Sequence, residues 1–344
     1  MLVRDLGERE LLKKLHQYCQ KEVVGDDAAI LSEVPRQGYQ LVVTTDVLVE
    51  EVHFSDRTTK PEDVGWRAVA ANFSDLVAMG ATPVGITVGL GVAGDTPISW
   101  VEGVYQGISH YLQKYQTNLV GGDVVRSAQR TLAVTAFGEV LPQRTIRRCH
   151  AQPGDAIAIT GWHGLSRAGL ELLLHPDRGN ALSQAQRDLL VSAHQQPQAR
   201  LDILPILQDI LGASWRVAGM DSSDGLADAI LQICQFSQVG ARLDRQKIPF
   251  PEALGQIASS ETIWQWILYG GEDFELVLCL PAASARTLVS RLGAAAAMIG
   301  EITSEPSVVL SDSSQTYPEQ NLCYENSFQH FQSQPINKRS DKLA

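Results

Sequence analysis

Hydrophobic positions in the first half of the chain follow two spacings. Val101, Val104, Ile108 and Leu112 recur every three to four residues and predict a helix over 98–115. Shorter apolar runs have the length of buried strands. These predicted strands are 41–45, 84–90, 119–121 and 132–140.

Two more helices are predicted in this half. Thr59, Pro61 and Glu62 form a capping-box pattern with proline in the first turn, which starts a helix that runs to about Met79 and ends at Gly80. An earlier helix leads into a Gly-Asp-Asp turn. Its apolar positions are Leu11, Leu12, Leu15, Tyr18 and Cys19.

Residues 141–154 interrupt this pattern with two prolines, three arginines and no apolar period. We therefore expect two domains, 1–145 and 146–331, followed by a disordered polar tail at 332–344. The second half alternates strands and helices again, which predicts an α/β protein with mixed sheets. Its expected elements are strands 156–160, 274–280 and 296–302, and helices 165–174, 199–211, 225–236 and 283–292.

Composition narrows the possible partners. The 344 residues carry a net charge of −11, which argues against nucleic acid or an anionic membrane as the main partner. The charged stretch 1–10 is no signal peptide, and the uncharged stretch 76–94 contains Pro83 and five glycines, as expected for a helix end, a turn and a strand. The five scattered cysteines lack CxxC spacing and predict buried thiols in a reducing cytoplasm.

Acidic residues cluster at the ends of the predicted elements. In the stretch VVGDDAAI two adjacent carboxylates would repel each other by roughly 4 kcal/mol at 4 Å and an effective dielectric of about 20. Any one such acid is expected to be a helix cap or a turn residue. Six clusters exist: Asp26 with Asp27, Asp46, Asn72 with Asp75, Asp123, Asp221 with Asp224, and Glu272 with Asp273.

Together, these clusters suit Mg²⁺, which binds oxygen ligands and shares its coordination with phosphate oxygens and water. The chain lacks the GxxxxGK[ST] sequence and a kinase-type glycine-rich loop. Gly89, Gly91 and Gly94 match GxGxxG, but no acid-terminated strand follows about 20 residues later, so a dinucleotide site is a minor alternative.

The order of the motifs resembles the thiamine-monophosphate kinase family, within the superfamily that includes aminoimidazole ribonucleotide synthetase. The motifs are GDDAA, TTDxLVxxxHF, NxSDLxAMGA, GGD, PGD, DSSDGL and GGEDxEL, between about Gly25 and Glu301, with a weaker match at Phe328. The HF after TTD and the AMGA segment favour this family over its relatives.

The resemblance implies two α/β domains, a homodimer formed by the first domain, and an active site between domains and across the dimer interface. No catalytic general base is expected, because the acceptor phosphate is already mostly ionised at pH 7. Several Mg²⁺ ions would be held by Asp27, Thr44, Thr45, Asp46, Asp75, Asp123, Asp221 and Asp224. ATP would contact Tyr105, Gly122, Asp123, Arg148 and Ser223, and thiamine monophosphate would contact His53, Glu272 and Phe328.

Several of these positions have a structural alternative. Tyr105 lies on the apolar stripe of its helix, His53 fits a strand, and Ser223 could cap the helix that follows it. The family's RSGAK-PGD motif reads Arg148-Cys149-His150-Ala151-Gln152 before Pro153 here. The neighbouring Arg147 and Phe331 remain alternatives to Arg148 and Phe328.

The implied reaction is transfer of the γ-phosphoryl group of ATP to thiamine monophosphate, the last step of thiamine diphosphate biosynthesis. Other ATP-using members of the superfamily, such as aminoimidazole ribonucleotide synthetase, are the alternative, as is a non-catalytic protein that binds Mg²⁺ and nucleotide. Selenophosphate synthetase would need a reactive cysteine in an N-terminal glycine-rich loop, and the hydrogenase-maturation relative ends in cysteine, whereas this chain ends in Ala344.

Overall fold

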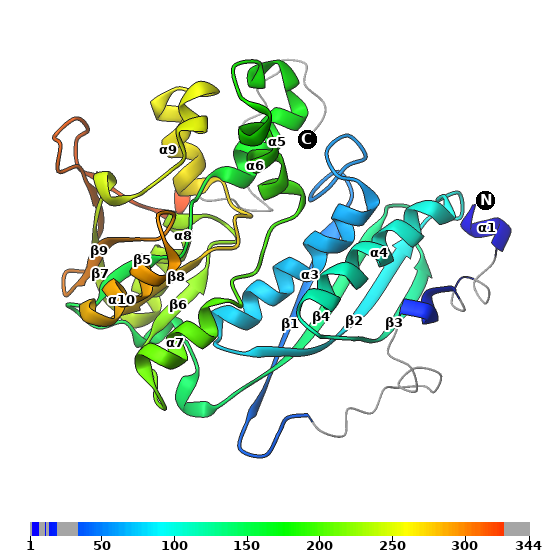
Figure 1. Cartoon of the computed structure of the whole chain (residues 1–344), viewed down its shortest axis with the longest axis horizontal. Coiled ribbons are helices and arrows are strands. Elements are labelled where there is room, and N and C mark those ends of the chain that lie inside the picture. Colours follow the sequence, from blue (N-terminus) through cyan, green and yellow to red (C-terminus); the bar gives the residue numbers. More distant parts are fainter. Residues whose placement is uncertain (1, 7–10, 12–13, 19–33, 327–344) are drawn as a thin grey trace.

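The computed structural model describes residues 2–6, 11, 14–18 and 34–326. Within them the chain forms two mixed sheets with helices packed against them, which confirms the predicted α/β class (Figure 1). The first sheet has four strands in the order β1-β4-β2-β3. These are β1 (Gln40–Val49), β2 (Thr82–Val92), β3 (Leu119–Arg126) and β4 (Thr131–Val140).

Two long helices, α3 (Pro61–Ala78) and α4 (Ile98–Lys114), lie side by side over one face of this sheet (Figure 1). Glycines let them approach closely, because a Cβ on Gly107 would lie 1.8 Å from the carbonyl oxygen of Glu62. A Cβ on Gly65 would likewise lie 1.9 Å from the carbonyl oxygen of Val104. This backbone contact fixes α3, the helix that carries much of the candidate site.

The other face of the four-stranded sheet, here called the outer face, is covered by no helix of the described chain (Figure 1). Side chains alternate along β1, so Leu41, Val43 and Val47 point to the outer face and are 45–53% exposed. Val125 on β3 is also 53% exposed. An apolar sheet face of this kind usually contacts another surface.

The second sheet has seven strands in the order β11-β10-β7-β9-β5-β8-β6. Its strands are β5 (Ala156–Ile159), β6 (Ala218–Asp221), β7 (Gly240–Asp244), β8 (Leu276–Leu280), β9 (Ala297–Thr303), β10 (Val308–Ser311) and β11 (Gln320–Asn321). The helices that belong to this half are α5 (Leu165–Leu174), α6 (Gln184–Gln195), α7 (Ile203–Leu211), α8 (Leu226–Ser237), α9 (Ser260–Tyr269) and α10 (Ala282–Leu292). The chain also contains α1 (Val3–Leu6) and 3-10 turns η1 (His16–Tyr18), η2 (Pro142–Arg144), η3 (Arg148–His150), η4 (Pro176–Gly179), η5 (Arg245–Lys247), η6 (Glu252–Gln256) and η7 (Tyr324–Asn326).

Helices cover both faces of the seven-stranded sheet. One hydrophobic cluster joins strand residues to α5, α8 and α9, and a second joins them to α7 and α10. A sheet buried on both faces favours continuous apolar strands, and every residue of β5 and β8 is buried. This half therefore has its own core, to which Val77 and Ala78 of α3 also contribute.

A segment after α6 ties the two halves together. The indole of Trp66 on α3 donates to the carbonyl oxygen of Pro197 at 2.8 Å, and the amide of Gln196 donates to Asp63 at 2.7 Å. The backbone N–H of Ala199 donates to the hydroxyl of Tyr111 on α4 at 2.9 Å. The acidic and basic side chains described below meet at this junction between α3 and the second half.

Most predicted elements of the first half are present, with β1 and β3 longer than predicted. The predicted capping box is wrong, because α3 starts at Pro61 behind Lys60 with no side-chain cap. The helix predicted near Leu11 is only partly described; Leu11 and Leu15 are buried, and the Gly-Asp-Asp turn lies outside the described residues. The dinucleotide alternative is wrong because Gly89 and Gly91 lie inside strand β2 and no helix opens there.

The second half contains elements that the hydrophobic pattern did not predict: α6, α9, β6, β7, β10 and β11. Most of these strands have only two to five residues, too short for a clear period. The described chain has no helix that is long and apolar enough to cross a membrane. Cys234 and Cys279 are buried thiols as predicted, whereas Cys149 is exposed, because it lies on the surface turn η3.

Candidate functional site

Three carboxylates from three elements meet where α3 contacts the second half. Asp46 comes from the inner face of β1, Asp75 from the last turns of α3, and Asp221 from the end of β6. We call these three residues the acidic cluster. Asp224, three residues after Asp221, lies near enough for its charge to act on Asp46.

Hydroxyl groups orient two members of the acidic cluster. Thr44 donates a hydrogen bond to Asp75 at 2.5 Å. Ser74 donates to one oxygen of Asp221 at 2.7 Å, and Ser223 donates to the other at 3.2 Å. Since Ser74 lies on α3 while Asp221 lies on β6, the bond between them joins the two halves of the chain at the site.

Burial and mutual repulsion make these acids unusually weak. Burial together with the charges of Asp75 and Asp224 raises the pKa of Asp46 to about 6. Burial and the neighbouring acids also raise the pKa of Asp221, which is 3% exposed, against the effect of its two serine donors. Burial raises the pKa of Asp75 as well, while Thr44 and the charge of Arg148 act in the opposite direction.

Arg148 lies near the acidic cluster, since its charge acts on Asp75. Its predicted contact with ATP requires such a position. Arg148 lies on η3, and its guanidinium donates to Gln232 of α8 at 2.6 Å. Its charge lowers the pKa of Asp75. Arg147, the neighbouring alternative, precedes η3, and both arginines are exposed.

The chemistry of the acidic cluster fits Mg²⁺, since every donor is a carboxylate or hydroxyl oxygen and the clustered charges weaken each acid. No group of three or more acidic, histidine or cysteine side chains in the described part of the chain already forms a complete cation site. Mg²⁺ usually binds one or two protein carboxylates together with water and substrate phosphates.

Four other predicted residues lie away from the acidic cluster. Thr45 points to the outer face, where its hydroxyl is 2.8 Å from that of Thr135. Gly122 and Asp123 lie on β3, at the opposite edge of the sheet from β1, roughly 14 Å away at the usual strand spacing. Tyr105 of α4 is 3% exposed in the hydrophobic core of the first half, and the centroid of its ring is 5.6 Å from that of Tyr18.

The predicted substrate residues His53 and Glu272 meet around a buried arginine that the sequence analysis did not single out. Arg67 of α3 donates to Glu272 at 2.6 Å and to the carbonyl oxygen of His53 at 3.2 Å. Its other nitrogen donates to the carbonyl oxygen of His194 at 2.8 Å and lies 3.0 Å from the imidazole Nε2. We call Arg67, Glu272, His53 and His194 the arginine cluster.

The arginine cluster holds one ionised acid and a neutral imidazole. Burial favours the neutral form of Glu272, but opposing effects, of which the charge of Arg67 is the largest, outweigh it and lower the pKa of Glu272. Burial and the charge of Arg67 lower the pKa of His194 to about 3. The Nδ1 of His53 accepts from the backbone N–H of Val49 at 3.0 Å, so its neutral ring carries the proton on Nε2.

A signal for Arg67 exists in the sequence, although it was not used. Arg67 precedes Ser74 and Asp75 by seven and eight residues, a spacing that places all three on one side of a helix. His194 ends a helix that was not predicted, so no sequence pattern connected it with Arg67. The predicted residues Asp27 and Phe328, and the alternative Phe331, lie outside the described residues.

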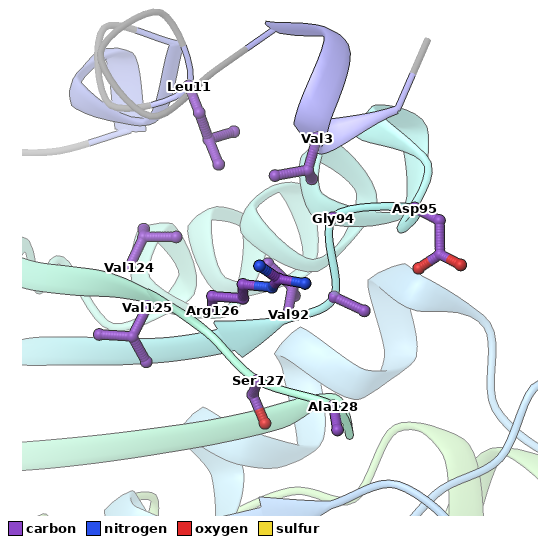
Figure 2. Close-up of a pocket in the computed structure, with 11 residues that line it drawn as sticks. Val3, Leu11, Val92, Gly94, Asp95, Val124, Val125, Arg126, Ser127 and Ala128 are labelled. Atoms are coloured by element: carbon purple, nitrogen blue, oxygen red, sulfur yellow. The ribbon is translucent and has the colours of Figure 1, made fainter.

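A hollow of about 790 Å³ lies elsewhere, at the end of β3 (Figure 2). Val3 and Leu11 border it on one side, and Val124, Arg126 and Ser127 border it on the other, with the side chain of Arg126 pointing into it (Figure 2). None of the predicted site residues lines it. The acidic and arginine clusters therefore lie outside this hollow.

Comparison with known proteins places this geometry in a family. The family model for the N-terminal domain of AIR synthase related proteins matches residues 25–140, and the model for the C-terminal domain matches residues 152–313. The thiamine-monophosphate kinase of Synechococcus elongatus is 50% identical over 329 residues, which cover 95% of this chain and 97% of that protein. The chain belongs to the thiamine-monophosphate kinase family.

Solved structures of the thiamine-monophosphate kinase family share the fold. The enzyme of Stenotrophomonas maltophilia is 30% identical with a TM-score of 0.76, over 88% of this chain and 95% of that one. AaThiL complexed with AMPPCP and TMP is 29% identical with a TM-score of 0.70, over 94% and 98% of the two chains. Family membership therefore extends across both sheets and includes the junction between them.

Proposed function

We propose that this chain transfers the γ-phosphoryl group of ATP to the phosphate of thiamine monophosphate, giving thiamine diphosphate and ADP. The observation that carries the proposal is the arrangement at the junction between the halves. There the acidic cluster lies near Glu272, an acid that is already paired with Arg67. Family membership and the relative solved with AMPPCP and TMP support it.

The chemistry requires charge neutralisation more than proton transfer. A phosphate monoester has a second pKa near 6 and is mostly ionised at pH 7, so the acceptor needs no general base. Mg²⁺, when bound, would supply the positive charge that neutralises the phosphate groups of the two substrates. The residues that we propose as its ligands are Asp27, Thr44, Thr45, Asp46, Asp75, Asp123, Asp221 and Asp224.

We assign the remaining residues to the two substrates. We propose that Arg148, whose charge acts on Asp75, contacts ATP phosphates, together with Tyr105, Gly122, Asp123 and Ser223. His53 and Glu272 would meet thiamine monophosphate, with Phe328 stacking on a ring. An ionised acid such as Glu272 suits a substrate with a cationic thiazolium and an aminopyrimidine.

We also propose a homodimer that forms through the outer face, with part of each site supplied by the partner chain. Asp123 pairs across the sheet with Gly89, Ala133 and Val47, so its side chain shares the outer face with the exposed apolar residues. Within one chain it lies at the far edge from Asp46. A second copy packed on this face would bring another Asp123 to the site.

Mixing two inactive variants tests this arrangement. Asp75→Asn and Asp123→Asn homodimers should each be inactive, but a heterodimer with cross-chain sites contains one intact site. Random mixing should restore about one quarter of the wild-type rate. If each site used Asp75 and Asp123 of the same chain, the mixture would stay inactive.

Residues 1–145 and 146–331 would then act as a dimerising, phosphate-binding domain and a substrate-contacting domain. The two sheets, which lie within 40–140 and 156–321, support this division. We place the enzyme in the cytoplasm, because the described cysteines Cys149, Cys234, Cys279 and Cys323 are free thiols.

ADP release, measured with and without thiamine monophosphate, tests the activity itself. The proposal expects release that depends on the monophosphate and on Mg²⁺, and little or none with thiamine, whose alcohol would need a base. ADP release that is equal with and without the monophosphate, or equal rates with thiamine, would contradict the proposal.

A further inference from the structure

Arg67 links three segments that are far apart in the sequence. It is 3% exposed on α3, and its two terminal nitrogens donate to Glu272, to the backbone of His53 and to the backbone of His194. Glu272 is 205 residues from Arg67 along the chain, and His194 is 127 residues from it. One guanidinium therefore fixes the relative positions of two predicted substrate contacts from different halves of the molecule.

Arg67 itself is not placed to touch a substrate. It is buried, and both terminal nitrogens already donate to protein groups. By contrast, the side chain of Glu272 is 36% exposed, so part of its carboxylate remains open to solvent and to a ligand. Any effect of Arg67 on substrate binding must therefore pass through Glu272 or the His53 segment.

The backbone around Glu272 gives a second, independent reason to expect a functional constraint. Glu272 has φ = +57° and Phe274 has φ = +51°, a left-handed conformation that costs non-glycine residues energy. The surrounding structure enforces it. The N–H of Glu272 donates to the carbonyl oxygen of Ser223 at 2.6 Å, and Asp273 accepts from the N–H groups of Gly164 and Ser166.

The other side of Arg67 is supported as well. His194 is 3% exposed, and its Nδ1 lies 3.2 Å from the hydroxyl of Ser166, the residue whose N–H donates to Asp273. The Glu272 loop and the Arg67 contact thus share one hydrogen-bonded frame. Such a supporting set is how proteins hold a binding group in a productive geometry.

We propose that Arg67 is a positioning residue for the acceptor substrate: it holds the Glu272 carboxylate and the His53 segment in one geometry, and thereby sets the affinity for thiamine monophosphate. The inference rests on the proposed function and extends it to a residue outside the substrate contacts. It separates Arg67 from residues that bind ATP or support folding alone.

A double-mutant cycle with Glu272 tests the proposal. Arg67→Met keeps an unbranched apolar stem and removes the donors, so it should raise the KM for thiamine monophosphate roughly 10-fold while the KM for ATP changes by less than about 2-fold. Glu272→Gln should raise the same KM. The double variant should show no more than about a 2-fold further increase over Glu272→Gln, because the acid carries most of the effect of Arg67 and the His53 segment carries the rest.

Arg245→Met is the matched control. Arg245 is also buried, and its Nε, like that of Arg67, has no hydrogen-bond partner among the described residues. It packs between the rings of Trp264 and Tyr317, 4.9 and 5.0 Å from their centroids. Its replacement should lower the thermal midpoint without changing the KM for thiamine monophosphate.

Several outcomes would overturn the inference. The first is an unchanged KM for thiamine monophosphate in Arg67→Met, and the second is an equal rise in the KM for ATP. The third is a double variant whose KM for thiamine monophosphate rises by the full product of the two single-variant increases. If Arg67→Met lacks a cooperative thermal transition, the same cycle is run with Arg67→Lys, which keeps the charge but loses the two-pronged donor. Wild-type protein without monophosphate-dependent ADP release would overturn the proposed function first, whereas normal wild-type kinetics with any of these variant results would overturn this inference alone.

Discussion

The acidic cluster and the arginine cluster both bring acids from the second half against α3, but the pKa values of their acids are shifted in opposite directions. Asp46, Asp75 and Asp221 face one another, and their pKa values are raised. Glu272 faces Arg67 at 2.6 Å, and its pKa is lowered. The same helix therefore contributes to one group of carboxylates that repel one another and to one ion pair in which Arg67 neutralises Glu272.

This difference separates two kinds of binding. A group of acids without a paired cation gains stability when cations bind, so it suits ions that accompany phosphates. A paired acid keeps its charge and direction before the ligand arrives, so it suits selective contact with a cationic ring. Substitutions at the two clusters should therefore change stability in opposite directions.

The largest expected effect is at Asp75. Asp75→Asn should reduce kcat at least about 100-fold, equivalent to about 2.7 kcal/mol, because a metal site supplies several kcal/mol of charge stabilisation. The metal-free thermal midpoint should stay unchanged or rise, because one repelling charge is removed. Steady-state rates and thermal unfolding measure both. Asp209→Asn on α7, which alters an exposed ion pair with Arg291 of α10, is the control. A fully active Asp75→Asn would contradict the metal assignment.

Glu272→Gln should have the opposite effect on stability. It leaves the buried Arg67 charge without its carboxylate and should cost about 2 kcal/mol, less than for a fully buried pair because Glu272 is 36% exposed. Urea unfolding measures the change. If Glu272→Gln stabilised the protein as Asp75→Asn is expected to do, the two clusters would not differ in the way proposed.

The buried imidazole of the arginine cluster should create a pH dependence. The pKa of His194 is about 6.5 in the unfolded chain and about 3 in the folded protein. Between these two pH values the unfolded state therefore binds a proton that the folded state does not. Stability is thus lost as the pH falls from 6.5 toward 3.

The variant His194→Gln lacks this titration, and its amide oxygen can still accept from Arg67. The stability advantage of the wild type over the variant should shrink by roughly 2 kcal/mol between pH 7.5 and pH 5. Unfolding free energies at both pH values test this. Parallel curves would show that His194 is not held neutral. Buried His163, present in both proteins, contributes equally and cancels.

The smallest expected effect is at Ser74, which joins the acidic cluster to α3. Ser74→Ala removes its hydrogen bond to Asp221 and should cost about 1 kcal/mol. The loss should be measured by urea unfolding without Mg²⁺. No change in unfolding free energy would show that this bond between the halves does not stabilise the metal-free protein.

Local patterns in the sequence accounted for the elements with the strongest periodicity. The stripe on α4 and the proline start of α3 predicted these helices nearly to their ends, since both depend on neighbouring residues alone. The helices α6 and α9 were not predicted. Helix α6 buries only Leu190 and His194, so its amphipathic signal is weak, and its position depends on contacts made elsewhere in the fold.

The sequence by itself determined which chemistry this protein can perform: oxygen ligands in seven ordered motifs, no lysine-containing phosphate loop, and a family resemblance that the comparisons confirm. Only the tertiary structure decided which of those residues meet. It turned Thr44 toward Asp75 and Thr45 toward the outer face, because strand side chains alternate. It also joined Arg67 to Glu272 over 205 positions, because packing of α3 against the second half, rather than any local spacing, brings those two charges together.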